Sequence, residues 1–153
     1  MTYTPVAAAR EKGVREGKVL SLKMADNITI YKGSMVCIDA AGYATTTPVA
    51  STCFAGIAVE TVANTATGHA AGAKSVRVAI TGVHSLTIAS GGAQALVGTE
   101  VYWNDGSSGS NILVSASDTG LGAKVGRVVE AVSATELMVL ITGYAFNVDA
   151  QAS

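Results

Sequence analysis

Two glutamates, Glu60 and Glu130, are the strongest candidates in this chain for a pair of catalytic residues. They occupy the same place in two similar segments, GIAVETV and GRVVEAV. A pair of carboxylates can supply the acid and the base or nucleophile that hydrolyse a glycosidic bond. The same carboxylates could form matched ion pairs with Arg77 and Arg127, and carboxylates outside a recognised motif are usually solvated or paired. Because the chain has only 1 tryptophan and few aromatic rings for a sugar site, we favour the ion pairs.

The other groups that could bind a metal or act as nucleophiles are isolated from one another in the sequence. His69 and His84 lack a second ligand at metal-binding spacing. Cys37 and Cys53 form no CxxC motif, and we interpret them as reduced thiols of a protein made in the cytoplasm. The motifs GxSxG, HExxH and the phosphate-binding loop are absent. We therefore expect no catalytic, cofactor-binding or metal-binding residue, and a protein that is not an enzyme.

The composition indicates one soluble domain with a partly covered surface. Of the 153 residues, 49% are hydrophobic and only 14% are charged, which is little charge for the surface of a free monomer. A partner that covers part of this surface would explain the low charge. Apolar runs are too short to span a membrane, and the first residues lack the apolar core of a signal peptide.

Basic residues are concentrated near the N-terminus. Residues 1–32 hold six basic and three acidic side chains, whereas the remainder is mildly acidic. Such an arm could contact an acidic surface, but no nucleic-acid-binding motif accompanies it. We expect an N-terminal arm over 1–16 that is either solvated or binds protein. Its candidate contacts with a partner or a neighbouring subunit are Arg10, Lys12, Arg15 and Lys18.

Three ordered segments occur twice in the chain. GSMVCID resembles GTEVYWND, GIAVETV resembles GRVVEAV, and VAITG resembles VLITG. This order predicts two pseudo-repeated β units, near 33–83 and 98–144. In this alignment Trp103 takes the place of Ile38, which has no polar group. We therefore predict that Trp103 is a core or interface aromatic and not an exposed stacking platform.

Alternating apolar residues and closely spaced turn signals predict a mainly β fold, a small barrel or sandwich. We expect both halves to pack into one compact barrel, and the apolar run TELMVLITG to be a strand buried on both faces. The domain would cover 17–144, with a C-terminal tail over 145–153. The predicted strands are 18–23, 27–31, 34–38, 54–62, 75–81, 83–89, 100–104, 111–115, 124–132 and 136–142.

The ordered segments REGKVLSLK, FAGIAVE, VRVAITGV, VYWND, VGRVVEA and LMVLITG resemble the capsid decoration, or cement, proteins of tailed bacteriophages. The resemblance covers roughly 15–143. The chain departs from the family in its longer N-terminal arm, in the loop at 62–75 and in SGGAQALVGTE before the aromatic strand.

The resemblance implies a β-rich domain, of the β-tulip type in some relatives, on the outer surface of an icosahedral head. It implies a structural virion protein that is made in the host cytoplasm and forms homotrimers. These would brace the major capsid protein without nucleic acid, membrane or cofactor. The alternative is a small β-barrel that binds carbohydrate or a cell surface. That module would need Trp103 and Tyr102 exposed beside other rings.

Overall fold

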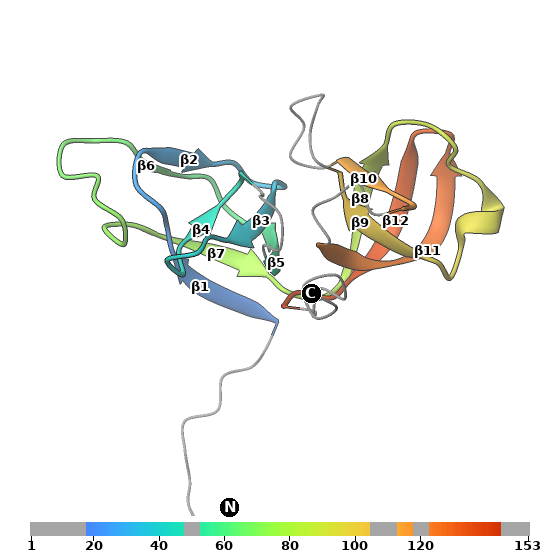
Figure 1. Ribbon diagram of the computed structural model, residues 1–153, viewed down its shortest axis with the longest axis horizontal. Coiled ribbons are helices and arrows are strands. Elements are labelled where there is room, and N and C mark those ends of the chain that lie inside the picture. Colours follow the sequence, from blue (N-terminus) through green and yellow to red (C-terminus); the bar gives the residue numbers. More distant parts are fainter. Residues whose placement is uncertain (1–17, 48–52, 105–112, 118–122, 145–153) are drawn as a thin grey trace, which may run out of the picture.

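The computed structural model describes residues 18–47, 53–104, 113–117 and 123–144 (Figure 1). The predicted mainly β fold is confirmed, whereas the predicted arm at 1–16 and tail at 145–153 lie outside the described residues. Strand β4 was not predicted, and the strand predicted over 54–62 is divided into β5 and β6. The described elements are β1 (Val19–Lys23), β2 (Ile28–Ile30), β3 (Met35–Ile38), β4 (Ala44–Thr45), β5 (Cys53–Ala58), β6 (Val62–Asn64), β7 (Ser75–Ala79), β8 (Val83–Ile88), the short 3₁₀ helix η1 (Gln94–Leu96), β9 (Glu100–Trp103), β10 (Leu113–Ser115), β11 (Lys124–Ser133) and β12 (Glu136–Ile141).

The strands form two units that follow each other along the chain. Unit one contains a five-stranded sheet in the order β1-β7-β5-β3-β4 and a small sheet of β2 and β6. Unit two is a closed barrel in the order β10-β8-β12-β11-β9. Figure 1 shows the two units side by side, the first in blue and green and the second in yellow and orange. The expectation that both halves share one barrel is therefore wrong, because unit two closes with its own five strands.

The five-stranded sheets of the two units have the same order of strands. Strands β1, β7, β5, β3 and β4 correspond to β8, β12, β11, β9 and β10. The barrel of unit two is closed by parallel pairing of β10 with β8, in which Val114 lies opposite Ile88. Unit one has a single parallel bridge at the matching place, between Met24 and Ala44. The first sheet is thus a less completely closed version of the second.

The register of the strands is also the same in both units. Val36 lies opposite Gly56 in unit one, and Val101 lies opposite Gly126 in unit two. A β-bulge follows next to this pair in both units. Pairing of Ala58 with Val78 is likewise matched by pairing of Val128 with Val139. The predicted pseudo-repeat is therefore confirmed for the strands in these segments.

Each unit begins one strand earlier than the similar segments indicated. The additional strands, β1 and β8, pair with β7 and β12 in the same register. Their sequences VLSLKM and VHSLTI share Val, Ser and Leu at equal offsets, a fourth match that our sequence comparison missed. Unit one therefore spans about 19–82 and unit two about 83–143.

A tight turn with glycine precedes β3 and β9 at matching positions. Gly33 and Gly98 both have φ of 89°, a conformation that other residues rarely adopt. The N–H of Ser34 donates to the carbonyl of Tyr31 over 3.1 Å, and that of Thr99 donates to Leu96 over 2.9 Å. Because the two turns have the same geometry, β3 and β9 begin at equivalent positions in their units.

The interiors of the units are equivalent in position but differ in the size of their side chains. At five matched positions unit two has the larger residue, so its barrel is filled by its own strands. In unit one the fully buried Ile30 of β2 joins the interior, and the partly buried Val62 of β6 packs against it. The five matched pairs are Ile38 and Trp103, Ala44 and Val114, Ala55 and Val125, Ala58 and Val128, and Val76 and Leu137.

The two units are joined by side-chain packing and by backbone hydrogen bonds. Phe54 of unit one meets Trp103 of unit two edge to face, with ring centroids 6.0 Å apart at 84°. Ile80 lies at the junction: its N–H donates to the carbonyl of Lys18 over 3.0 Å, and its carbonyl accepts from the N–H of Gly143 over 2.9 Å. The N–H of Tyr144 donates to the carbonyl of Phe54 over 2.7 Å. The first and last described residues of the chain therefore meet at this junction.

Candidate functional site

Glu60 forms the ion pair that the sequence analysis favoured over a catalytic role. Its carboxylate accepts from the backbone N–H of Arg77 over 3.0 Å and lies 3.2 Å from Nη2 of the same residue. The backbone contact, followed by the guanidinium, lowers the pKa of Glu60 below its ordinary value. This carboxylate is thus held ionised, as a structural anion would be.

The predicted symmetric partner pair, Glu130 with Arg127, is wrong. Arg127 instead bonds Glu100, with Nη2 and Oε1 separated by 3.1 Å. The symmetry fails because Met138 occupies in β12 the place that Arg77 occupies in β7, and it lies opposite Glu130 in the sheet.

The two cysteines are thiols on the paired strands β3 and β5, and the histidines lie elsewhere in the described ranges. His69 is exposed in the loop after β6, and a ring nitrogen of His84 lies 3.3 Å from the carbonyl of Thr81. Cys37 is buried, and burial raises the pKa of the half-buried Cys53. No group of three His, Cys, Asp or Glu that could hold a metal occurs in the described parts of the chain. Nor do these parts contain a helix long and apolar enough to cross a membrane.

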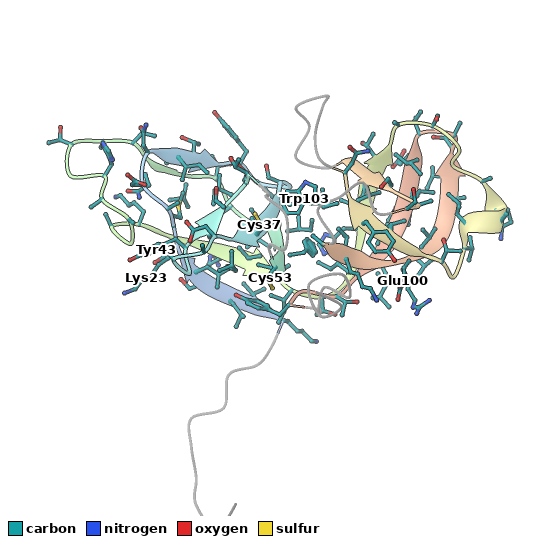
Figure 2. All side chains as sticks on the ribbon, viewed as in Figure 1. Lys23, Cys37, Tyr43, Cys53, Glu100 and Trp103 are labelled. Atoms are coloured by element: carbon teal, nitrogen blue, oxygen red, sulfur yellow. The ribbon has the colours of Figure 1, made fainter. Side chains whose placement is uncertain are left out.

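Trp103 is a core aromatic, as predicted. Only 1% of its surface is exposed, and it belongs to the same buried cluster as Val101 and Val125. Its neighbour Tyr102 is half-buried and donates through its hydroxyl to Glu100 over 3.3 Å. An indole covered in this way cannot stack on a sugar. Figure 2 shows Trp103 beside unit one and Glu100 farther out on unit two.

The predicted arm contacts can be placed for one residue only. Lys18 is exposed, directly before β1. Arg10, Lys12 and Arg15 lie outside the described residues.

The outside of unit two bears a group of three charges, of which the sequence analysis singled out only Arg127. Glu100 lies 3.3 Å from the ammonium of Lys124 and bonds Arg127, which also donates to the carbonyl of Gly98 over 3.0 Å. The hydrogen bond from Lys124 and the charge of Arg127 lower the pKa of Glu100. Pairing of β9 with β11 brings these side chains together from separate segments.

Apolar side chains lie exposed beside these charges. Val83 and Leu140 are opposite each other on β8 and β12, and they are 50% and 44% exposed. Val129 of β11 is 43% exposed. The expectation that β12 is buried on both faces is wrong, because Leu137, Val139 and Ile141 face the barrel interior and Leu140 faces outward. Unit two thus presents a mixed apolar and charged outer surface.

Comparison with known proteins identifies no relative: no protein-family model, curated protein or solved structure matches the chain.

The ion pair of Glu60 gives a prediction for pH dependence. Because its folded pKa is lowered, the pair stabilises the fold above the unfolded pKa, and this contribution is lost as the pH falls through the folded pKa. In Arg77→Ala, nuclear magnetic resonance titration should show the pKa of Glu60 rising only part of the way to its ordinary value, because the backbone N–H at residue 77 still donates. Arg127→Ala is the control and should raise the pKa of Glu100 while that of Glu60 stays unchanged. An unshifted Glu60 in the wild-type protein would contradict the pair.

Proposed function

We propose that this chain is a capsid decoration protein. It binds the outer surface of an icosahedral phage head and stabilises it by bridging subunits of the major capsid protein. The observation that carries the proposal is the exposed apolar surface of unit two, at Val83, Val129 and Leu140, on a protein with few charges. Val83 and Leu140 lie opposite each other on neighbouring strands, and apolar surface left exposed on a protein with few charges favours a role in assembly. The resemblance of the ordered β segments to phage decoration proteins supplies the partner.

Stabilisation of the shell would follow from selective binding. A protein that binds the assembled shell and not its separated subunits lowers the free energy of the shell by mass action. Burial of apolar surface across subunit junctions also raises the barrier to their separation. No chemical step is required, so we propose no catalytic role, cofactor, nucleic acid or membrane.

The proposed assembly is a homotrimer on the virion surface, formed from chains made in the host cytoplasm. Closed symmetry satisfies the same contact in every copy, which suits a protein with one partly apolar surface. The arm would add contacts through Arg10, Lys12, Arg15 and Lys18 to acidic patches of neighbouring subunits. Lys18 itself is exposed directly before β1, and its carbonyl accepts from the N–H of Ile80 at the junction of the units.

Attachment to heads tests the proposed function directly. Purified protein is added to undecorated, expanded heads, and the copies bound per head are counted. We expect saturation at a fixed number of copies and a higher temperature of head disruption. Heads that neither take up the protein nor gain stability would overturn the proposal.

Deletion of residues 1–16 tests the arm. The body from β1 onward contains both units with their complete sheets, so the thermal midpoint of the isolated protein should stay nearly unchanged. Head occupancy should fall because the charged contacts are lost. Full occupancy by the truncated protein would refute the role of the arm. Failure of that protein to fold would show that the arm belongs to the core.

A further inference from the structure

The same outer face of the sheet occurs in both units, and it is buried in unit one but exposed in unit two. In unit one the outward side chains of β3, β5 and β7 near the junction are buried: Met35, Cys37, Phe54, Ile57 and Ala79. The matching positions in unit two form what we call the β9–β11–β12 face, and all five of its residues are at least partly exposed. These are Glu100, Tyr102, Lys124, Arg127 and Leu140.

The face of unit one is buried through contact with unit two. Met35, Phe54 and Ile57 belong to the same buried cluster as the interior of the second barrel, and Phe54 meets Trp103. Trp103 is the last residue of β9, so the end of this strand contributes to the cover. The fold therefore already shows what kind of surface packs on this face: the β9 end of a unit of the same fold.

We propose that the β9–β11–β12 face binds a second copy of this chain, through the end of its β3. Ile38 and Asp39 at that end occupy in unit one the places of Trp103 and Asn104 in unit two. Within the chain, the β9 end of unit two packs on the face of unit one. If unit one of a neighbouring copy packs in the same way on unit two, the end of its β3 lies on the β9–β11–β12 face. The proposal assigns the Leu140 side of the exposed surface to self-association and does not depend on capsid binding.

The chemistry of the two surfaces is complementary. The face holds two cations, Lys124 and Arg127, against the single anion Glu100, and the aliphatic Leu140 lies beside them. The end of β3 offers a carboxylate, Asp39. Its Oδ1 accepts from the N–H groups of Ala41 and Tyr43, each over 2.9 Å, which fixes the turn that would be presented.

The interface between the two units of one chain is apolar, whereas the proposed interface between two copies is more polar. This difference is expected, because a face that remains exposed in the free chain must stay soluble. Each copy contributes its β9–β11–β12 face to one neighbour and the end of its β3 to another, so the contact is head-to-tail. Such contacts close into a ring when the rotation between neighbouring copies allows it.

Analytical ultracentrifugation over a range of protein concentrations tests the face. Leu140→Glu places a further negative charge in the contact and should raise the dissociation constant at least tenfold. Val132→Glu is the matched control: Val132 lies on the same barrel near the far end of β11 and is 48% exposed. The control should associate like the wild type. A monomeric wild type, or equal association of Leu140→Glu and wild type, would overturn the proposal.

A mixing experiment tests the head-to-tail geometry. Ala40→Arg places a cation at the exposed turn after β3, opposite the cations of the face, and should also weaken association. When Ala40→Arg is mixed with Leu140→Glu, the first variant has an intact β9–β11–β12 face and the second has an intact β3 end. These two surfaces can still bind each other. The mixture should therefore form mixed oligomers, beginning with mixed dimers, while each variant alone associates more weakly than the wild type. Absence of mixed oligomers, or normal association of either single variant, would reject the pairing of this face with this end. Near-ultraviolet circular dichroism of each variant confirms that it is folded.

Discussion

Gly126→Ala should destabilise the protein by about 3 kcal/mol or more, because the added methyl group has no space. A Cβ at this position would lie 2.0 Å from the carbonyl oxygen of Leu140 and 2.9 Å from the Cα of Ile141. Both contacts are to the backbone of the neighbouring strand, which can move only if the barrel opens. Chemical denaturation of the wild type and the variant measures the loss.

Two further glycines make this test specific. Gly56 occupies the equivalent place in unit one, where a Cβ would lie 2.1 Å from the carbonyl oxygen of Ala79. Gly56→Ala should therefore cost a similar amount. Gly91 has φ of 84° but open space around it, so Gly91→Ala should cost only the strain of that conformation, about 1 to 2 kcal/mol. Equal losses at Gly126 and Gly91 would show that the close approach of the strands is not the cause.

Trp103→Ala should lower the free energy of unfolding by about 3 to 5 kcal/mol, as removal of a buried aromatic ring generally does. The ring is almost fully buried, and it contacts Phe54 across the junction of the units. Ile38→Ala should cost less, because the matching Ile38 is half-buried. The measurement is denaturant unfolding followed by circular dichroism, since the variant lacks the single tryptophan of the chain.

A double-mutant cycle and the fluorescence of the wild type complete this test. Combined Phe54→Ala and Trp103→Ala should cost less than the two single losses together, because the edge-to-face pair is lost in either. The wild-type emission should be blue-shifted and insensitive to added sugars. Red-shifted emission that a sugar quenches would contradict the buried position and revive the carbohydrate-binding alternative.

The strands could be predicted because their signal is local. Alternation in SVRVA places Val76 and Val78 toward the interior, and these side chains are buried in β7. The position of Trp103 could be predicted for a related reason, since the similar segments aligned it with a residue that has only hydrocarbon to bury. Alignment did not reveal two separate sheets, because closure depends on which distant strands meet. The contact of Met24 with Ala44 leaves no pattern in the sequence.

The candidate surface was hidden for the same physical reason. Glu100 and Arg127 are separated along the chain and meet only through the pairing of β9 with β11. Leu140 lies in a continuous apolar run, which reads as a strand buried on both faces. A signal was present in the repeat itself: Ile57 aligns with Arg127 and Met35 with Glu100, so one face changes from apolar to charged between the copies.

The hydrogen bonds of Ile80 also bear on fusion proteins built from this chain. Its N–H and carbonyl tie Lys18 and Gly143 to the same residue, and Figure 1 shows the two ends of the described chain close together. A peptide joined to either terminus would therefore leave the body of the protein from nearly the same point. If, as proposed, the protein binds a phage head through its N-terminal arm, a cargo attached after β12 would start on the side of the head and require a linker to reach the solvent. Neighbouring ends also suit a circular permutant, in which the two ends of the described chain are joined and new ones are opened at the exposed turn between β11 and β12. Such a permutant would carry the cargo on the side of unit two away from the junction.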